Sequence, residues 1–237
     1  MFSRILAILS FVLVGLATVR AADSSPVKIA IIGDSTVCEY PEDAPSRGWG
    51  HYIGESFQDN VKIVNLAAGG RSTKSFIKEG RWTKTLAEKP QFILIQFGHN
   101  DSHAKEKPEA TDAATDYREY LRQYVNEARG IGAIPVFVTP MLRRTYKADG
   151  AFDDILEPYA EAMKAVAAEL KVPLVDLHAM SSELYLKLGP EKARELENKP
   201  GDNTHFGEKG GRAMAELVMS KLPGAVPELQ PLLKAAK

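Results

Sequence analysis

Apolar runs of strand length recur along the chain, separated by stretches long enough to hold a helix. Within each run the apolar residues are nearly continuous rather than alternating, which is typical of strands buried on both faces of a parallel sheet. The pattern therefore predicts five buried strands. They cover residues Val27–Ile32, Val61–Leu66, Phe92–Phe97, Ala133–Thr139 and Pro173–Leu177.

Helical spacing of apolar residues follows three of these runs, within Tyr117–Ala128, Leu156–Leu170 and Ala213–Leu222. Strands that alternate with helices predict an α/β fold, here a three-layer α/β/α sandwich around a five-stranded parallel sheet with right-handed crossovers. No internal repeat or low-complexity linker divides the chain. We therefore expect one domain over residues 22–237, with a short C-terminal tail from about Pro223 whose packing the pattern leaves open.

The first residues have a different pattern. Arg4 is followed by the apolar run Ile5–Ala17, and small residues follow at Ala21 and Ala22. This predicts a secretory signal peptide over residues 1–21, because a membrane span needs about 20 apolar residues. An uncleaved anchor is the alternative. We expect a secreted or periplasmic protein with no stable membrane association after cleavage.

Composition narrows the classes of function. The 237 residues are 44% hydrophobic and 26% charged, with 30 Lys and Arg against 31 Asp and Glu. A net charge of −1 gives no basic excess for nucleic-acid binding. The single cysteine, Cys38, excludes an intramolecular disulfide and any multi-cysteine metal centre, and is expected to be a buried small residue. We expect a monomer without a cofactor.

Ligands of such sheets bind beyond the carboxyl ends of the strands. The segment Gly33–Val37, which reads GDSTV, follows the first strand, and Ser35 at this turn can project its hydroxyl as a nucleophile. The alternative is an ordinary turn, since Gly, Asp and Ser are common turn residues. The glycine-rich patterns that bind nucleotide phosphates are absent.

Two further segments supply uncharged N–H donors. After the second strand, Gly69 and Gly70 allow backbone N–H groups to approach a ligand closely, or simply make a tight connection into a helix. After the third strand, Asn100 offers side-chain N–H groups suited to an oxyanion, although asparagine also caps helices.

Histidines near Asn100 raise the question of a metal. His99, Asp101 and His103 alternate along the chain, but no third histidine is near them. We therefore expect no metal site, and instead expect His99 to be a structural or substrate-contacting residue.

A carboxylate and an imidazole precede the last helix. Asp202 and His205 are three residues apart, so the carboxylate can accept Nδ1–H and leave Nε2 to take a proton from a serine hydroxyl. Alternatively, Asp202 is an ordinary helix N-cap and His205 a bystander. Together the four segments contain a nucleophile, two neutral N–H sources and an acid–base pair. Acyl transfer from an oxygen ester needs these parts.

In this order the segments resemble the SGNH (GDSL-like) hydrolase superfamily, and most closely its rhamnogalacturonan acetylesterase group. The resemblance runs from Val27 to about Leu222. It implies a flavodoxin-like sheet of strand order 2-1-3-4-5 and no metal in the mechanism. The matching stretches are GDSTV, GWG, NLAAGGRSTKSF, EGRW, QFGHND, TPMLRR and DNTHFGEKG.

The resemblance also implies roles for individual residues. Ser35 matches the nucleophile, His205 the general base and Asp202 the acid that orients it. The oxyanion hole would consist of the Ser35 and Gly70 backbone N–H groups and the Asn100 side chain. The implied substrate is acetylated pectin, especially rhamnogalacturonan.

Cationic and aromatic side chains within the matching stretches are candidate substrate contacts. Arginines can pair with galacturonate carboxylates and tryptophans can stack on a sugar; the alternative is that they bridge loops and fill the core. The candidates are Arg71, Arg81, Arg143, Arg144, Trp49 and Trp82.

The sequence thus predicts a secreted carbohydrate esterase that removes acetyl groups from plant cell-wall polysaccharide. Acetylated xylan is an alternative substrate. A lipolytic esterase or thioesterase on the same scaffold would need an apolar acyl groove. A carbohydrate-binding module is the non-enzyme alternative, and the presence of Ser35, Asp202 and His205 argues against it.

Overall fold

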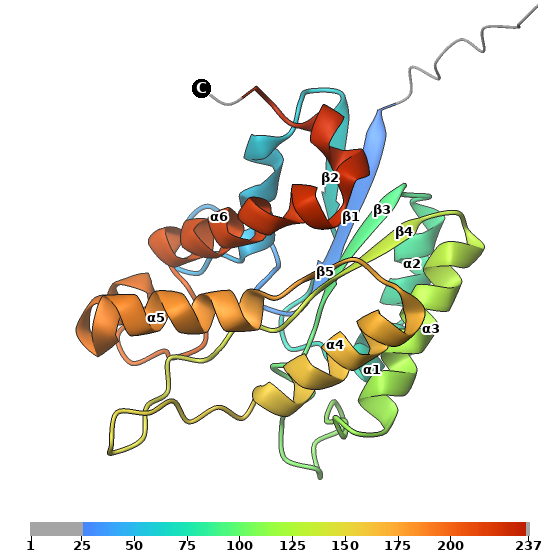
Figure 1. The fold of residues 1–237 in the computed structure, drawn as a ribbon. Coiled ribbons are helices and arrows are strands. Elements are labelled where there is room, and N and C mark those ends of the chain that lie inside the picture. Colours follow the sequence, from blue (N-terminus) through green and yellow to red (C-terminus); the bar gives the residue numbers. More distant parts are fainter. Residues whose placement is uncertain (1–25, 236–237) are drawn as a thin grey trace, which may run out of the picture.

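The computed structural model describes residues 26–235, so the expected signal peptide at residues 1–21 lies outside the described residues. Five strands form one parallel sheet in the order β2-β1-β3-β4-β5 (Figure 1). The predicted α/β fold and its strand order are confirmed. The strands are β1 (Val27–Gly33), β2 (Val61–Asn65), β3 (Phe92–Gln96), β4 (Ile134–Val138) and β5 (Leu174–Val175).

The edge strand β5 is shorter than the predicted run Pro173–Leu177. Only Leu174 and Val175 pair with β4, because the chain turns into a helix directly afterwards. The Asp176 side chain caps that helix by accepting a hydrogen bond from the Ala179 N–H at 3.2 Å.

Helices cover both faces of the sheet and make three layers (Figure 1). Side chains of β1 alternate between them: Ile29 and Ile31 join the core under α5 and α6, whereas Ala30 and Ile32 join the core under α1 to α4. The α-helices are α1 (Thr73–Lys78), α2 (Arg81–Ala87), α3 (Asp116–Gly130), α4 (Glu157–Leu170), α5 (Leu177–Ala193) and α6 (Glu208–Ala225). The short 3-10 helices are η1 (Trp49–His51), η2 (Ile53–Ser56), η3 (Arg194–Leu196) and η4 (Pro227–Leu232).

Three of these helices carry no clear periodic signal in the sequence. Helices α1 and α2 are too short for one, with six and seven residues. Helix α5 is interrupted at Gly189, whose φ of 73° is not helical, and Pro190 follows it. One regular apolar stripe therefore cannot run along its whole length.

The expected C-terminal tail packs against the domain. Helix α6 continues past Pro223 to Ala225, and η4 then buries Leu229. Gln58 N–H donates to the Leu232 carbonyl at 2.9 Å, which fixes the end of η4 beside the start of β2.

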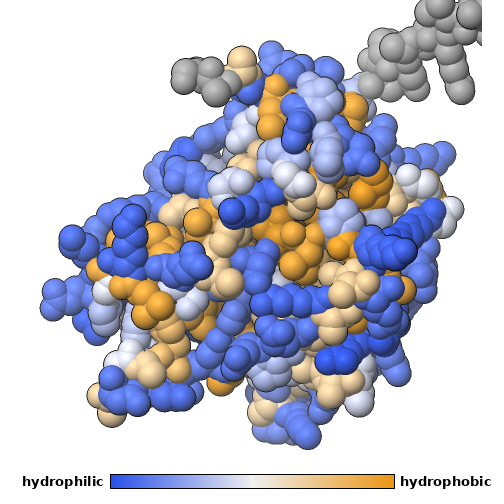
Figure 2. All heavy atoms as spheres, viewed as in Figure 1, coloured by the Kyte–Doolittle hydropathy of each residue, from blue (hydrophilic) through white to orange (hydrophobic). Residues whose placement is uncertain are grey.

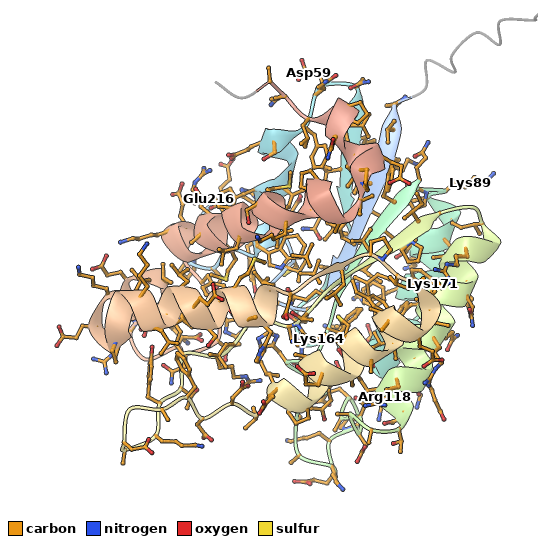
Figure 3. The ribbon with its side chains drawn as sticks, in the orientation of Figure 1. Asp59, Lys89, Arg118, Lys164, Lys171 and Glu216 are labelled. Carbon is orange, nitrogen blue, oxygen red and sulfur yellow. The ribbon has the colours of Figure 1, made fainter. Side chains whose placement is uncertain are left out.

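Most charged side chains of the described residues lie at the outside of the three layers. Asp59, Lys89 and Glu216 are exposed and point away from the core (Figure 3). The face seen in Figure 2 is mostly hydrophilic, with apolar atoms gathered near its middle. Among the described residues, no helix combines the length and the apolar character that crossing a membrane requires.

Candidate active site

Ser35 lies on a tight turn at the carboxyl end of β1. The Asp34 carbonyl accepts a hydrogen bond from Val37 N–H at 3.2 Å, which closes one helical turn around Ser35. The turn needs glycine at position 33, because a Cβ there would lie 2.6 Å from the Gln96 carbonyl oxygen. Ser35 itself is half-buried, so its hydroxyl lies at the sheet edge within reach of a ligand.

A buried chain of polar side chains holds this turn from below. Asp34 Oδ1 accepts from the Thr36 N–H at 2.9 Å and from the Thr36 hydroxyl at 2.8 Å. Gln96 Nε2 donates to the same hydroxyl at 2.8 Å, and Trp49 Nε1 donates to Gln96 Oε1 at 2.7 Å. These hydrogen bonds favour one conformation of the turn. The second Asp34 oxygen, Oδ2, is buried without a hydrogen-bond partner among the described residues.

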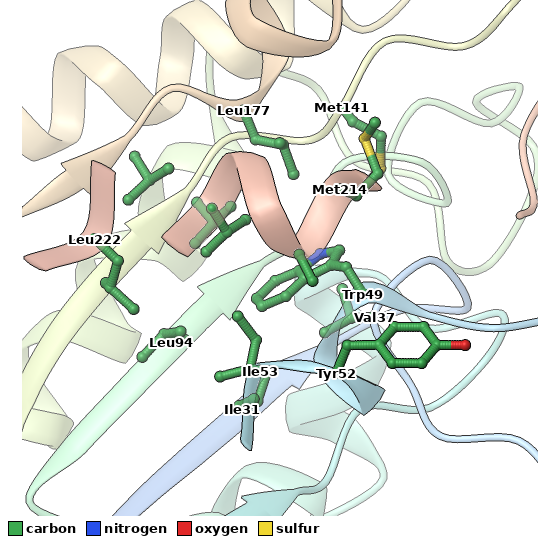
Figure 4. Close-up of a cluster of buried hydrophobic side chains, with 14 of the residues drawn as sticks. Ile31, Val37, Trp49, Tyr52, Ile53, Leu94, Met141, Leu177, Met214 and Leu222 are labelled. Carbon is green, nitrogen blue, oxygen red and sulfur yellow. The ribbon is translucent and has the colours of Figure 1, made fainter. Parts of the chain in front are cut away.

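Trp49 is therefore a core residue, and its expected role of stacking on a sugar is wrong. Its side chain is 0% exposed. The ring packs between the sheet and α6, beside Ile53, Leu94 and Met214 (Figure 4). The only polar atom of the indole, Nε1, donates its hydrogen to Gln96. The ring therefore lies inside the fold without an unpaired donor.

The structure brings Ser35, His205 and Asp202 together in a chain of two hydrogen bonds, which we call the relay. His205 Nε2 lies 2.9 Å from Ser35 Oγ, and His205 Nδ1 lies 3.0 Å from Asp202 Oδ2. The His205 side chain is 35% exposed and the Asp202 side chain 13%. These are the distances and the order that a serine, a general base and an orienting carboxylate require.

Asp202 is held as a carboxylate. Burial raises the pKa of its carboxyl group, but hydrogen bonds from the backbone N–H groups of His205 and Thr204, together with the His205 ring, lower it to about 2. The alternative role of Asp202 as the N-cap of the last helix is wrong. Helix α6 begins at Glu208, and its N-cap residue is Gly207.

The glycine loop after β2 runs beside the serine. A Cβ on Gly69 would lie 3.6 Å from Ser35 Cβ. Ala68 N–H donates to the Gly33 carbonyl at 2.9 Å, which anchors the loop to the turn that carries Ser35. Gly70 has a φ of +78°, in the left-handed region that favours glycine.

Asn100 lies on the next loop, after β3, and faces the glycine loop. Its Nδ2 donates to the Arg71 carbonyl at 3.0 Å, and the same nitrogen carries a second hydrogen. The neighbouring Asp101 anchors this loop, since it accepts from the hydroxyls of Thr73 and Thr111. Burial raises the pKa of the Asp101 carboxyl group, and the hydrogen bonds from the two threonines oppose this effect only in part, so the resulting pKa is about 7.

His99 is 2% exposed, so its expected role as a substrate contact is wrong. Its Nδ1 lies 3.4 Å from Asp34 Oδ2, beneath the turn that carries Ser35. His103 instead pairs with Glu109 at 2.6 Å on the surface. His99, Asp101 and His103 therefore do not converge. Within residues 26–235, no group of three or more His, Cys, Asp or Glu side chains is arranged to hold a metal ion.

Two of the candidate arginines lie at the surface beside the glycine loop. Arg71 Nε lies 3.0 Å and Arg81 Nε 2.7 Å from the same Glu79 oxygen. Two cations on one carboxylate leave a net positive charge. Arg71 and Glu79 also line a surface cavity of about 460 Å³ that reaches Gly70. The other residues that line it are Ser75, Lys78, Pro108 and Glu109.

The remaining candidates have structural partners. Arg143 is half-buried and donates to the His99 carbonyl at 2.8 Å. Arg144 is buried and donates to backbone carbonyls, so its expected role in substrate binding is wrong. Trp82 is buried, and its Nε1 donates to Glu127 at 2.7 Å.

Three residues that support Ser35 were not assigned a role from the sequence. Tyr40 donates its hydroxyl to the Ser35 carbonyl at 2.8 Å. Asp34 and Gln96 form the buried chain below the turn. Asp34 could have been suspected, since it belongs to the GDS segment; nothing in the sequence marks Tyr40. Cys38 is buried, as expected for a small apolar residue.

Comparisons with known proteins identify the family of this chain. Residues 31–213 match the GDSL-like Lipase/Acylhydrolase family. Rhamnogalacturonan acetylesterase RhgT of Bacillus subtilis is 41% identical over 209 residues, which cover 81% of this chain and 88% of RhgT. The B. subtilis protein named "Probable rhamnogalacturonan acetylesterase YesY" is 39% identical, covering 80% and 89%. The crystal structure of B. subtilis YxiM superposes with a TM-score of 0.74 at 28% identity, covering 84% of this chain and 56% of that one.

Proposed function

The chain belongs to the GDSL-like lipase/acylhydrolase family and is an esterase, and on this premise we propose that it removes acetyl groups from a carbohydrate by a serine mechanism. The observation that carries the proposal is the relay of Ser35, His205 and Asp202, with successive distances of 2.9 and 3.0 Å. The names of RhgT and YesY support acetyl as the acyl group.

In the first half of the proposed reaction, Ser35 Oγ attacks the acetyl carbonyl carbon while His205 Nε2 takes the hydroxyl proton. The carbonyl oxygen becomes an oxyanion. Backbone N–H groups of Ser35 and Gly70 and the second hydrogen of Asn100 Nδ2 stabilise this charge. The C–O bond to the sugar then breaks, and the protonated His205 returns its proton to the sugar oxygen. Acetyl-Ser35 remains.

In the second half, water attacks the acetyl-Ser35 carbonyl and His205 takes a proton from that water. The same donors stabilise the second oxyanion. Collapse of the intermediate releases acetate, and the proton on His205 returns to Ser35 Oγ. Asp202 keeps the neutral imidazole in the tautomer that accepts at Nε2 before each attack, because its carboxylate binds the Nδ1–H.

Asn100→Ala is expected to lower kcat by about 10²–10³-fold, the usual loss on removing one oxyanion donor. Asp101 anchors the loop through Thr73 and Thr111, so the variant is expected to fold. Steady-state kinetics on p-nitrophenyl acetate, with circular dichroism as the control for folding, measure this. A folded variant that turns over like wild type would remove Asn100 from the mechanism.

We further propose that the protein is exported and that its substrate is acetylated rhamnogalacturonan. The pair Arg71 and Arg81 supports a substrate with carboxylates, since both share the single Glu79 beside the cavity that reaches Gly70. A galacturonate carboxylate can accept charge-assisted hydrogen bonds from such guanidinium groups. The names of RhgT and YesY support the same polymer.

Acetate release from rhamnogalacturonan and from xylan of matched acetyl content tests the substrate. We expect release from the pectic polymer to be the faster, because its backbone galacturonates offer carboxylates to Arg71 and Arg81, whereas the xylose backbone of xylan has none. Arg71→Gln should reduce this preference, while Arg129→Gln, at the far end of α3, should not. Equal release from both polymers would indicate a broader carbohydrate acetylesterase. A preference for long acyl chains would instead indicate a lipolytic enzyme.

A further inference from the structure

A buried arginine lies against the loop that carries the base and its orienting carboxylate. Arg144 comes from the connection between β4 and α4, and it is only 3% exposed. Its Nη2 donates to the Asp202 carbonyl and to the His205 carbonyl, both at 2.8 Å. Its own backbone N–H donates to the Asn203 carbonyl at 2.9 Å. One residue thus holds the carbonyls of positions 202, 203 and 205.

The guanidinium of Arg144 lies among aromatic rings, and its side-chain hydrogen bonds go to this loop. Its central carbon lies 4.5 Å from the centroid of the Phe206 ring and 5.9 Å from that of Tyr185. Within residues 26–235, no carboxylate forms a salt bridge with Arg144, and its Nε and Nη1 are buried without a hydrogen-bond partner. A buried cation with incomplete partners is a weak source of stability. Its bonds are concentrated on the backbone of the catalytic loop.

Other bonds fix the C-terminal end of that loop: the Phe206 carbonyl accepts from Arg47 N–H at 2.8 Å, and Gly207 N–H donates to the Leu196 carbonyl at 3.1 Å. Arg144 holds the carbonyls before this point. Residues 201–207 precede α6 and contain no regular helix or strand. The His205 ring is anchored by Asp202, and Asp202 belongs to the same loop. A shift of the loop backbone would therefore move base and carboxylate together, away from Ser35 Oγ. A misplacement of about 1 Å in an active site can cost 10²-fold in rate.

We propose that Arg144 is a positioning residue for ester hydrolysis: it fixes the backbone of Asp202 and His205 so that Nε2 stays within hydrogen-bond reach of Ser35. The inference rests on the proposed serine mechanism. Arg144 does not contact the substrate, because it is buried beneath the loop. Its effect is therefore expected in kcat and to be independent of the substrate.

Two variants test this role. Arg144→Met keeps the apolar length of the side chain and removes its donors, and we expect kcat to fall about 10²-fold with KM nearly unchanged. The fall should be equal on p-nitrophenyl acetate and on an acetylated polysaccharide. Arg144→Lys keeps the charge but lacks the planar fork that bridges two carbonyls, so a smaller loss in kcat is expected.

Arg129→Met is the matched control. Arg129 also donates to a backbone carbonyl, that of Leu170 at 2.8 Å, but it is exposed and lies on the surface of α3. The kcat of the Arg129→Met variant should equal that of wild type. All rates are referred to folded protein measured by circular dichroism, so a merely structural role of Arg144 would lower the folded fraction and leave kcat unchanged.

Several outcomes would overturn the proposal. Wild-type kcat in folded Arg144→Met would do so, and so would a raised KM with unchanged kcat. If Arg144→Met does not fold, Arg144→Lys decides: a reduced kcat supports the role and a wild-type kcat refutes it. Ser35→Ala separates the two proposals, since activity retained in that variant contradicts the serine mechanism itself rather than the role of Arg144.

Discussion

Ser35→Ala is expected to lower kcat for acetate-ester hydrolysis by about 10⁶-fold, the loss that a comparable serine hydrolase shows without its nucleophile. The variant retains Gly70, Asn100 and His205, but no oxygen remains 2.9 Å from His205 Nε2 to form the acyl-enzyme. The Ser35 side chain is half-buried, and the turn is held by Asp34 and its neighbours. The variant is therefore expected to fold like wild type.

The measurement is turnover of p-nitrophenyl acetate together with acetate release from a polysaccharide. Ser220→Ala is a suitable control, because Ser220 is exposed on α6 and its hydroxyl only donates to the Leu217 carbonyl. Turnover comparable with wild type in folded Ser35→Ala would show that Ser35 is not the nucleophile.

Asp202→Asn is expected to lower kcat by about 10⁴-fold, as the corresponding change does in another serine hydrolase. The Asn oxygen can still accept the backbone N–H groups of Thr204 and His205, so the loop keeps its shape. The Asn nitrogen, however, donates toward Nδ1. The imidazole then carries its hydrogen on Nε2 and cannot take the Ser35 proton.

The pH profile of the wild-type enzyme gives a second check on Asp202. Its pKa is lowered from 3.8 to about 2, so the interactions of this carboxylate stabilise the fold fully above about pH 4. That contribution is lost only as the pH falls through about 2. A decline in activity at mildly acidic pH therefore does not come from protonation of Asp202. A folded Asp202→Asn enzyme with wild-type kcat would remove the orienting role.

The sheet was predictable because its strands are buried on both faces. In the run Phe92–Phe97 every residue except Gln96 is apolar, because helices cover both sides of the strand, and this pattern can be seen without knowing which residues pack against it. Helix α5 was not predictable in the same way. This helix breaks at Gly189, and it packs against α6 and η3. Helix α6 is a separate segment of the chain, and η3 is shorter than one helical turn, so neither contact gives a periodic pattern within α5.

The candidate site, like the fold, was predictable from the sequence only in part. Ser35, Asn100 and the Asp202–His205 pair could be selected because their residue types suit the chemistry and each follows a predicted strand or precedes the last helix. The roles of Trp49 and Arg144 were wrong for a physical reason. Trp49 finds its partner in Gln96, 47 positions away, and Arg144 donates to backbone carbonyls, which every sequence contains.

Ser35 and His205, the proposed nucleophile and base, are 170 positions apart in the sequence. During synthesis, the β1 turn with Ser35 is complete long before the ribosome has made the segment that contains His205. The relay closes only when the segment before α6 reaches the sheet edge, so a growing or C-terminally shortened chain holds a serine without a base. In refolding from denaturant, the return of esterase activity would thus time the arrival of the last segment, whereas circular dichroism would follow the formation of the helices.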